Sequence, residues 1–199
     1  MTAVITGDII NSRAQKASKW LPILKKVLNK YGQTPGQWEI YRGDSFQLEL
    51  APQEALKAAL YIKASIRQTS NLDVRMAIGI GDKTHQAQKI TESNGSAFIH
   101  SGECFETLKK QTLAVKSPNP KLDEAINLLL ALALLTINNW STVTSLVVKA
   151  SIENPQKNQK ELAALLGKSQ SNISETLKRA GFEEVIRLEE KYRTLINEL

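Results

Sequence analysis

Two aspartates, Asp8 and Asp44, stand where short apolar segments end, and this placement suits metal chemistry. Asp8 lies in the segment AVITGDII at 3–10, and Asp44 lies at the turn of the hairpin-like segment QWEIYRGDSFQLEL at 37–50. If these segments are neighbouring strands of one sheet, the two carboxylates can converge. Paired carboxylates hold Mg²⁺ when the ion also carries substrate phosphates. We therefore expect a Mg²⁺ site at Asp8 and Asp44.

Each aspartate also has a purely structural interpretation. Aspartates at turns accept hydrogen bonds from nearby backbone N–H groups and stabilise hairpins. Gly43 suits a turn that needs a positive φ, and Arg42 either contacts a phosphate or pairs with Asp44. The sequence leaves the metal-binding and the structural interpretation open.

A second set of residues, at 159–179, suits nucleic-acid chemistry. The sequence QKELAALLGKSQSNISETL at 159–177 has the small and apolar spacing of a helix-turn-helix, with Gly167 in the turn and Ser169 as the cap of the second helix. Polar side chains at the start of that helix can read base edges, and basic ones contact phosphates. The expected DNA-binding residues are Lys168, Gln170, Ser171, Asn172, Ser174, Lys178 and Arg179.

The same helix pair also serves protein contacts in other proteins. The basic surplus of the second half is confined to 149–179, and residues 121–199 carry equal numbers of acidic and basic side chains. The apolar spacing at 182–199 predicts a packing helix or a dimer helix, since helix-turn-helix proteins often read two half-sites. A homodimer is one expected partnership, beside DNA.

The remaining periodicity predicts the elements that position both sites. We expect strands at 2–10, 37–50 (a hairpin), 72–80 and 112–115, and helices at 18–31, 53–68, 96–110 and 122–138. The segment SPNP at 117–120 is the clearest linker. The predicted fold is α+β, a ferredoxin-like or palm βαββαβ domain at 1–117 followed by an all-α helix-turn-helix domain at 118–199.

Composition narrows the class of protein. The 199-residue chain is 42% hydrophobic, carries a net charge of +6 and has a single cysteine, so it needs no internal disulfide. Its beginning lacks the features of a signal peptide, and its longest apolar run is too short to cross a bilayer. We expect a cytoplasmic protein with anionic partners and no membrane association.

The segment 1–116 resembles the palm domains of class III nucleotidyl cyclases, diguanylate cyclases and palm-type polymerases. The resemblance depends on Asp8-Ile9, on RGDSF at 42–46 and on MAIGIG at 76–81. It implies two metal-binding aspartates, Asp8 and Asp44, and a phosphate cradle after the first of them. The expected nucleotide-binding and phosphate-binding residues are Ile9, Ile10, Asn11, Ser12, Arg42 and Gly43.

The sequence departs from those enzymes at positions that matter for catalysis. A diguanylate cyclase has an acid where Ser45 stands, and class III cyclases have Asn and Arg where an ungapped alignment puts Ile99 and Glu103. Losing such groups removes stabilisation of the transition state.

Over nearly its full length the chain is similar to the SatD family of small bacterial proteins, a resemblance that implies an architecture and no settled activity. We expect a DNA-binding regulator with a nucleotide-binding palm domain. The alternatives are an active cyclase or nucleotidyltransferase with a tail for assembly, and a palm kept as a dimerisation scaffold.

Overall fold

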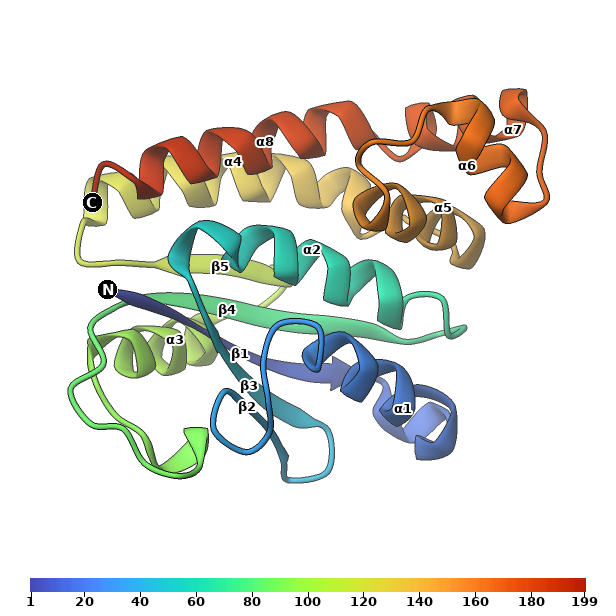
Figure 1. The fold of residues 1–199 in the computed structure, drawn as a ribbon. Coiled ribbons are helices and arrows are strands. Elements are labelled where there is room, and N and C mark those ends of the chain that lie inside the picture. Colours follow the sequence, from blue (N-terminus) through green and yellow to red (C-terminus); the bar gives the residue numbers. More distant parts are fainter.

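The structure, a computed structural model, describes residues 1–199 as a five-stranded sheet with eight α-helices (Figure 1). The strands are β1 (Thr2–Ile10), β2 (Trp38–Tyr41), β3 (Ser45–Leu50), β4 (Asp73–Gly81) and β5 (Leu113–Lys116). The helices are α1 (Ala17–Leu28), α2 (Ala55–Ile66), α3 (Ser96–Thr107), α4 (Pro120–Ile137), α5 (Thr142–Glu153), α6 (Gln159–Leu166), α7 (Gln170–Arg179) and α8 (Phe182–Ile196). The expected α+β class is confirmed.

The sheet has the strand order β2-β3-β1-β4-β5, with β1 at its centre. Strand β1 is antiparallel to both β3 and β4, and β5 is parallel to β4. Successive side chains of β1 point to opposite faces of the sheet. Ile5 packs in the core with α1 and α2, whereas Val4 packs with Ala97 of α3 on the other face. Asp8 falls on the same alternation as Val4, and therefore on the α3 face.

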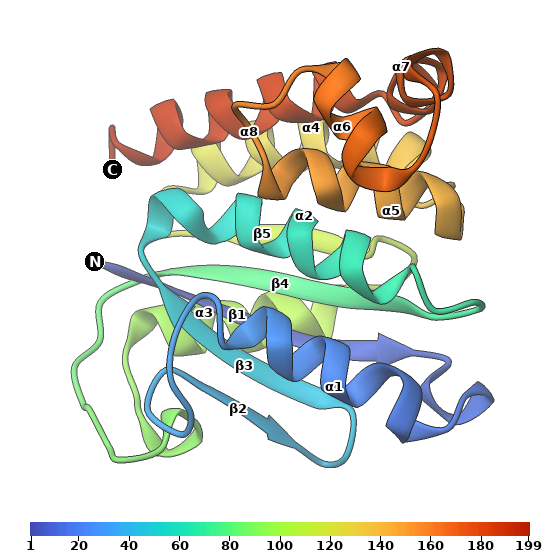
Figure 2. The same ribbon diagram turned by 45° about the vertical axis from the view of Figure 1, so that its right-hand side comes forward.

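Helices cover both faces of the sheet (Figure 2). Helices α1 and α2 lie on one face and α3 on the other, where α3 approaches β4 very closely at Gly79. A Cβ on Gly79 would lie 2.1 Å from the backbone nitrogen of Ser101 and 2.3 Å from the carbonyl oxygen of Ala97. Glycine is therefore required there by space alone.

The second half of the chain packs directly on the first. After β5 the chain enters α4, and α8 later runs back antiparallel beside α4 (Figure 1). One hydrophobic core includes Ile5 of β1, Leu60 of α2, Leu130 of α4 and Tyr192 of α8. The buried Tyr192 hydroxyl also donates a 2.9 Å hydrogen bond to the Pro52 carbonyl. The linker at 117–120 thus separates two segments that share one core.

One helix end that differs from the sequence prediction matters for the site described below. The helix expected at 96–110 ends at Thr107, because Leu108 leaves helical geometry and its side chain turns inward. Lys109 and Lys110 consequently lie in a loop. The polar stretch at 82–95 forms a loop with the short 3-10 helix η3 (Ile90–Glu92), and it packs against β2 and β3 on the α3 face. None of the helices has the length and apolar character needed to span a bilayer.

Candidate functional sites at the sheet edge and in the helical half

The predicted acidic residues line one open pocket of about 650 Å³ at an edge of the sheet. Asp8 pairs in register with Ser45, and the backbone N–H of Ile9 donates a 3.2 Å hydrogen bond to the carbonyl of Asp44. The two strands are neighbours, as the hypothesis required, and both aspartates face the same space. The other lining residues are Ile9, Ile10, Asn11, Ser12, Arg13, Ala14, Arg75, Lys109, Lys110, Gln111 and Thr112.

The Asp8 carboxylate is held by Arg75 of β4. Arg75 donates to both oxygens, through Nε at 3.2 Å and Nη2 at 2.6 Å, and its guanidinium lies 4.7 Å from the centre of the Phe105 ring. The hydrogen bond to Asp8 raises the pKa of Arg75. Arg75 stands directly across from Asp8 in the β1–β4 register, so the antiparallel pairing of these strands was the signal that could have identified it.

The Asp44 carboxylate lies beside the phosphate cradle that the sequence predicted. The Ser12 hydroxyl donates to Asp44 Oδ2 at 2.5 Å, and Asn11 between β1 and Ser12 has a left-handed backbone with φ 61°. Arg42 and Gly43 also have positive φ, 51° and 92°, as the turn requires. Arg42 and Gly43 are exposed on the hairpin and do not line the pocket.

Two lysines that sequence reasoning did not assign to the site complete the pocket. Lys109 and Lys110 lie in the loop between α3 and β5, and with Arg13 and Arg75 they make four cations around two carboxylates. The dipeptide was hidden because it was expected inside a helix. The sequence carries no local signal for this position, because Leu108 fits the helical period and ends the helix by turning into the core. The excess of positive charge suits a phosphate-bearing ligand.

The donor set also fits a Mg²⁺ ion that arrives with its phosphates. Such an ion needs only one or two protein carboxylates, because phosphate oxygens and water fill its other positions. Asp44 would hold it through the oxygen that Ser12 leaves free, and Asp8 would join once Arg75 turned to the phosphate. No group of three or more acidic, His or Cys side chains comes together as a metal site anywhere in the structure, this pocket included, so the protein supplies only two carboxylates here.

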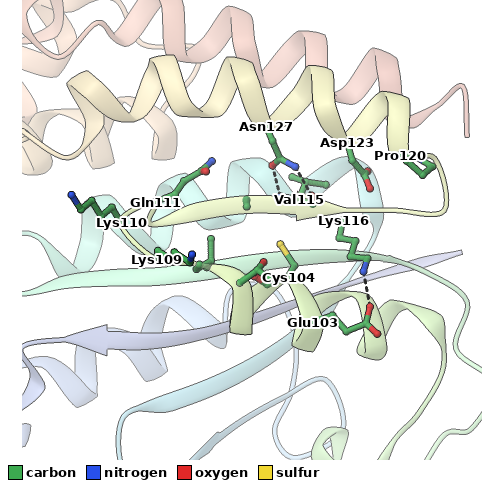
Figure 3. Close-up of a pocket in the computed structure, with 13 residues that line it drawn as sticks. Glu103, Cys104, Lys109, Lys110, Gln111, Val115, Lys116, Pro120, Asp123 and Asn127 are labelled. Atoms are coloured by element: carbon green, nitrogen blue, oxygen red, sulfur yellow. Dashed lines mark hydrogen bonds and ion pairs between the residues drawn. The ribbon is translucent and has the colours of Figure 1, made fainter.

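The positions that class III cyclases use for transition-state stabilisation lie outside this pocket. Ile99 is 52% exposed on α3, and Glu103 forms a 2.6 Å ion pair with Lys116. Glu103 instead borders a neighbouring hollow between α3, β5 and α4 (Figure 3). There the Asn127 side chain bonds both the N–H and the carbonyl of Val115, each at 2.8 Å. The polar groups of this hollow therefore fasten α4 to β5.

The predicted DNA-binding segment forms two helices joined by a short turn. Helix α6 carries a capping box between Asn158 and Glu161 and ends at Gly167, which has φ 61°. Ser169 then caps α7 by accepting from the N–H of Asn172. The buried sides of α6 and α7 pack against α5 through Leu162, Ala163, Ile173, Val147 and Ala150.

The outward side of α7 is polar and basic. It exposes Gln170, Ser171, Asn172, Ser174, Glu175, Lys178 and Arg179, and Lys168 is half-buried in the turn. The α6–α7 pair lies at one end of the helical layer (Figure 1). All seven predicted DNA-binding residues thus lie on one continuous stretch of surface or at its edge.

A buried polar network connects the pocket to the end of α7. Thr112, which lines the pocket, accepts from Lys63 at 3.0 Å and donates to the side chain of Asn138 at 2.8 Å. Arg67 donates to the backbone carbonyls of Asn138 and Trp140, and the Trp140 indole N–H donates to Ala180, the residue that ends α7. Asp73 closes the network by accepting from both Lys63 and Arg67.

The comparison with protein families agrees with the resemblance to the SatD family inferred from the sequence. The family model of the SatD family matches residues 2–196, almost the whole chain. No curated protein matches the sequence.

Proposed function

The chain belongs to the SatD family, and we propose that it is a DNA-binding regulator whose sheet domain binds a nucleotide or another phosphate-bearing ligand. The observation that carries the proposal is the α6–α7 helix pair. It combines a left-handed glycine in the turn, a capped second helix and an exposed polar start on that helix. This combination is typical of a helix-turn-helix, whose second helix enters the major groove.

The polar side chains at the start of α7 can form hydrogen bonds with base edges in the major groove. Asn172 and Gln170 can each form paired hydrogen bonds with adenine, and Ser171 or Ser174 can bond bases or phosphates. Lys178 and Arg179 end the helix and would contact phosphates beside the groove. Glu183 and Glu184 follow in the first turn of α8, and Arg187 and Lys191 of α8 line one groove with Lys178 and Arg179.

The test compares matched variants of the full chain on a selected duplex and on random duplexes over a series of salt concentrations. Asn172→Ala should reduce the preference for the selected sequence, because a paired base contact is worth about 1–3 kcal/mol of discrimination. Lys178→Ala should weaken all duplexes and lower the salt slope by about one unit. Lys25→Ala removes an exposed lysine of α1 and is the charge-matched control.

Two outcomes would contradict DNA reading by α7. One is a full chain without affinity for any duplex at low salt. The other is an equal loss of duplex affinity in Lys25→Ala and Lys178→Ala, which would mean that binding depends only on the net charge of the protein.

For the sheet domain we propose a phosphate-bearing ligand held by the basic pocket. Lys109, Lys110 and Arg75 would contact phosphates, and Asp44 would hold an accompanying Mg²⁺. A nucleotide-binding screen with and without Mg²⁺ tests this. Lys110→Ala should weaken binding under both conditions, and Asp44→Ala should abolish the effect of Mg²⁺. Lys121→Ala, an exposed lysine on α4, should change neither. Unchanged binding by Lys110→Ala would exclude this pocket.

A second candidate function is nucleotidyl transfer with Asp8 and Asp44. The observation in its favour is that both carboxylates line one pocket. The exposed Ile99 and the ion-paired Glu103 weigh against rapid catalysis, because neither residue lines the pocket and the transition state would lack two stabilising groups. Rapid Mg²⁺-dependent release of pyrophosphate from ATP or GTP would favour the enzyme. Binding without turnover would favour the regulator.

A further inference from the structure

Helix α4 has an outward face made only of apolar side chains. From Ala125 to Val148 the sequence has no charged residue. The leucines on this face are unusually exposed: 63% for Leu128, 59% for Leu132 and 70% for Leu135. The complete face consists of Ala125, Leu128, Leu129, Ala131, Leu132 and Leu135, all exposed. We call it the α4 outer face.

The spacing on this face is that of a helix-pairing seam. Ala125, Leu128, Leu132 and Leu135 recur at intervals of three and four residues, the a and d positions of a heptad. Such a seam is buried when a second helix with the same period packs against it. The inner side of α4, with Leu130 and Leu134, is already buried against the rest of the chain. The outer apolar residues are therefore not needed to pack α4 against its own chain.

We propose that the α4 outer face is the interface with a second copy of this chain, with the two α4 helices antiparallel across a two-fold axis. The leucines of this face are not among the residues proposed for DNA or ligand binding, and the test below uses neither DNA nor ligand, so the proposal stands or fails independently of the proposed function. In an antiparallel pair each a position meets a d position. Leu128 then packs beside Leu132 of the second copy, and the small Ala125 lies opposite the large Leu135.

The buried area favours self-association over a small contact. The four leucines of the face, including Leu129 at 39%, expose together more than two whole leucine side chains per copy. Pairing two copies therefore buries more than four, as a cluster at the centre of the interface. Surface patches of this kind on soluble proteins mark interaction sites, and an apolar centre with a polar rim is the usual anatomy of an interface.

Charged side chains border the apolar face on one side. Between α4 and α8 a groove of about 790 Å³ includes Leu129 and Leu132 on one side and the charged Lys178, Arg179, Glu184, Arg187 and Lys191 on the other. A two-fold pair would also present two copies of α7, as paired half-sites require.

The test is the mass of the full chain in solution, measured by sedimentation over a range of concentrations. The wild type should be a dimer. Leu132→Glu should weaken it by at least about a hundredfold, because a charge would be buried in an apolar seam. Leu135→Glu should do the same. Ile99→Glu, at a comparably exposed aliphatic residue on α3, should leave the dimer unchanged. Circular dichroism should show that all three variants are folded.

Cross-linking tests the direction of the helices. A mixture of Leu128→Cys and Leu132→Cys chains should form disulfides between the two variants more readily than either variant forms with itself. The native Cys104 is buried and does not compete. A wild type that stays monomeric, a Leu132→Glu variant that stays dimeric, or a preference of each cysteine for its own copy would each overturn the proposal.

Discussion

Replacing Asp73 by asparagine should destabilise the protein far more than replacing its partner Lys63 by methionine. The Lys63 side chain is completely buried and lies 2.8 Å from Asp73, which also accepts from Arg67. Asp73→Asn leaves two cations, one of them wholly buried, without their counter-charge. Removing one partner of a buried ion pair typically costs about 3–5 kcal/mol, and we expect a loss of unfolding free energy of that size.

Lys63→Met removes the buried charge itself and leaves Asp73 paired with Arg67. The variant loses the hydrogen bonds from Lys63 to Thr112 and to the Val74 carbonyl, and a hydrogen bond of this kind contributes about 1 kcal/mol. The desolvation of the ammonium group disappears at the same time and offsets part of that loss. We therefore expect at most about 1–2 kcal/mol of destabilisation.

Urea unfolding followed by circular dichroism gives both values. Glu92→Gln is the control, because the Lys89–Glu92 pair is 3.9 Å long and its side chains are 52% and 61% exposed. Such exposed pairs contribute less than about 1 kcal/mol. Equal losses for Asp73→Asn and Lys63→Met, or a larger loss for the methionine variant, would refute the account of this network.

The pH dependence has a defined sign. Burial lowers the pKa of Lys63 below its ordinary value of 10.5, although Asp73 partly opposes the shift. Between the lowered folded value and 10.5 the unfolded chain binds more protons, so stability rises with pH. The wild type should therefore gain stability relative to Lys63→Met as pH increases toward 10.5. Tyrosine ionisation affects both proteins and cancels in the difference.

Three substitutions and one chemical treatment test other parts of the structure. Gly79→Ala should cost about 3 kcal/mol or more in urea unfolding, because its Cβ would meet the backbone of α3; Gly102→Ala, with nothing within 4 Å of its Cβ, should instead stabilise by about 0.5–1 kcal/mol. Asn158→Ala removes the cap of α6 and should lower the unfolding free energy by about 1 kcal/mol, and no change would contradict the capping box. Burial raises the pKa of the Cys104 thiol to about 11, so alkylation by iodoacetamide at neutral pH should be much slower in the folded protein than in urea; similar rates would refute its burial.

The sheet was predictable because its strands carry strong alternation. β1, the β2–β3 hairpin and β4 each place apolar residues at every second position or in a continuous buried run, and their expected bounds differ from the observed ones by one residue at most ends. Helix ends were harder. Leu108 fits the helical period of α3, and only its contact with the core ends the helix at Thr107. That contact is tertiary, so local pattern could not show it.

The parts of the candidate sites that depend on neighbouring residues in the chain were predictable, and the parts that depend on distant contacts were not. The caps and the turn of α6–α7 are set by neighbours in the chain, and Gly167 and Ser169 have the roles expected of them. The pocket depends on distant pairing. Arg75 reaches Asp8 only because β1 and β4 are adjacent, and a lysine such as Lys63 is ordinarily exposed on a helix. No local pattern distinguishes these residues from solvated charges.

The linker at 117–120 marks a change of architecture, and the packing on either side of it would couple the proposed ligand site to the proposed DNA-binding helix. Helices α4 and α8 complete the core that β1 and α2 begin, so α7 is fixed relative to the sheet. Thr112 faces the pocket and bonds Asn138, while Arg67 and Trp140 extend the network to the end of α7. A ligand that moves the 109–112 loop would act on these partly buried hydrogen bonds. Such bonds are costly to leave unmade, and that cost is the physical means by which occupancy of the proposed ligand pocket would reach the proposed DNA-binding surface.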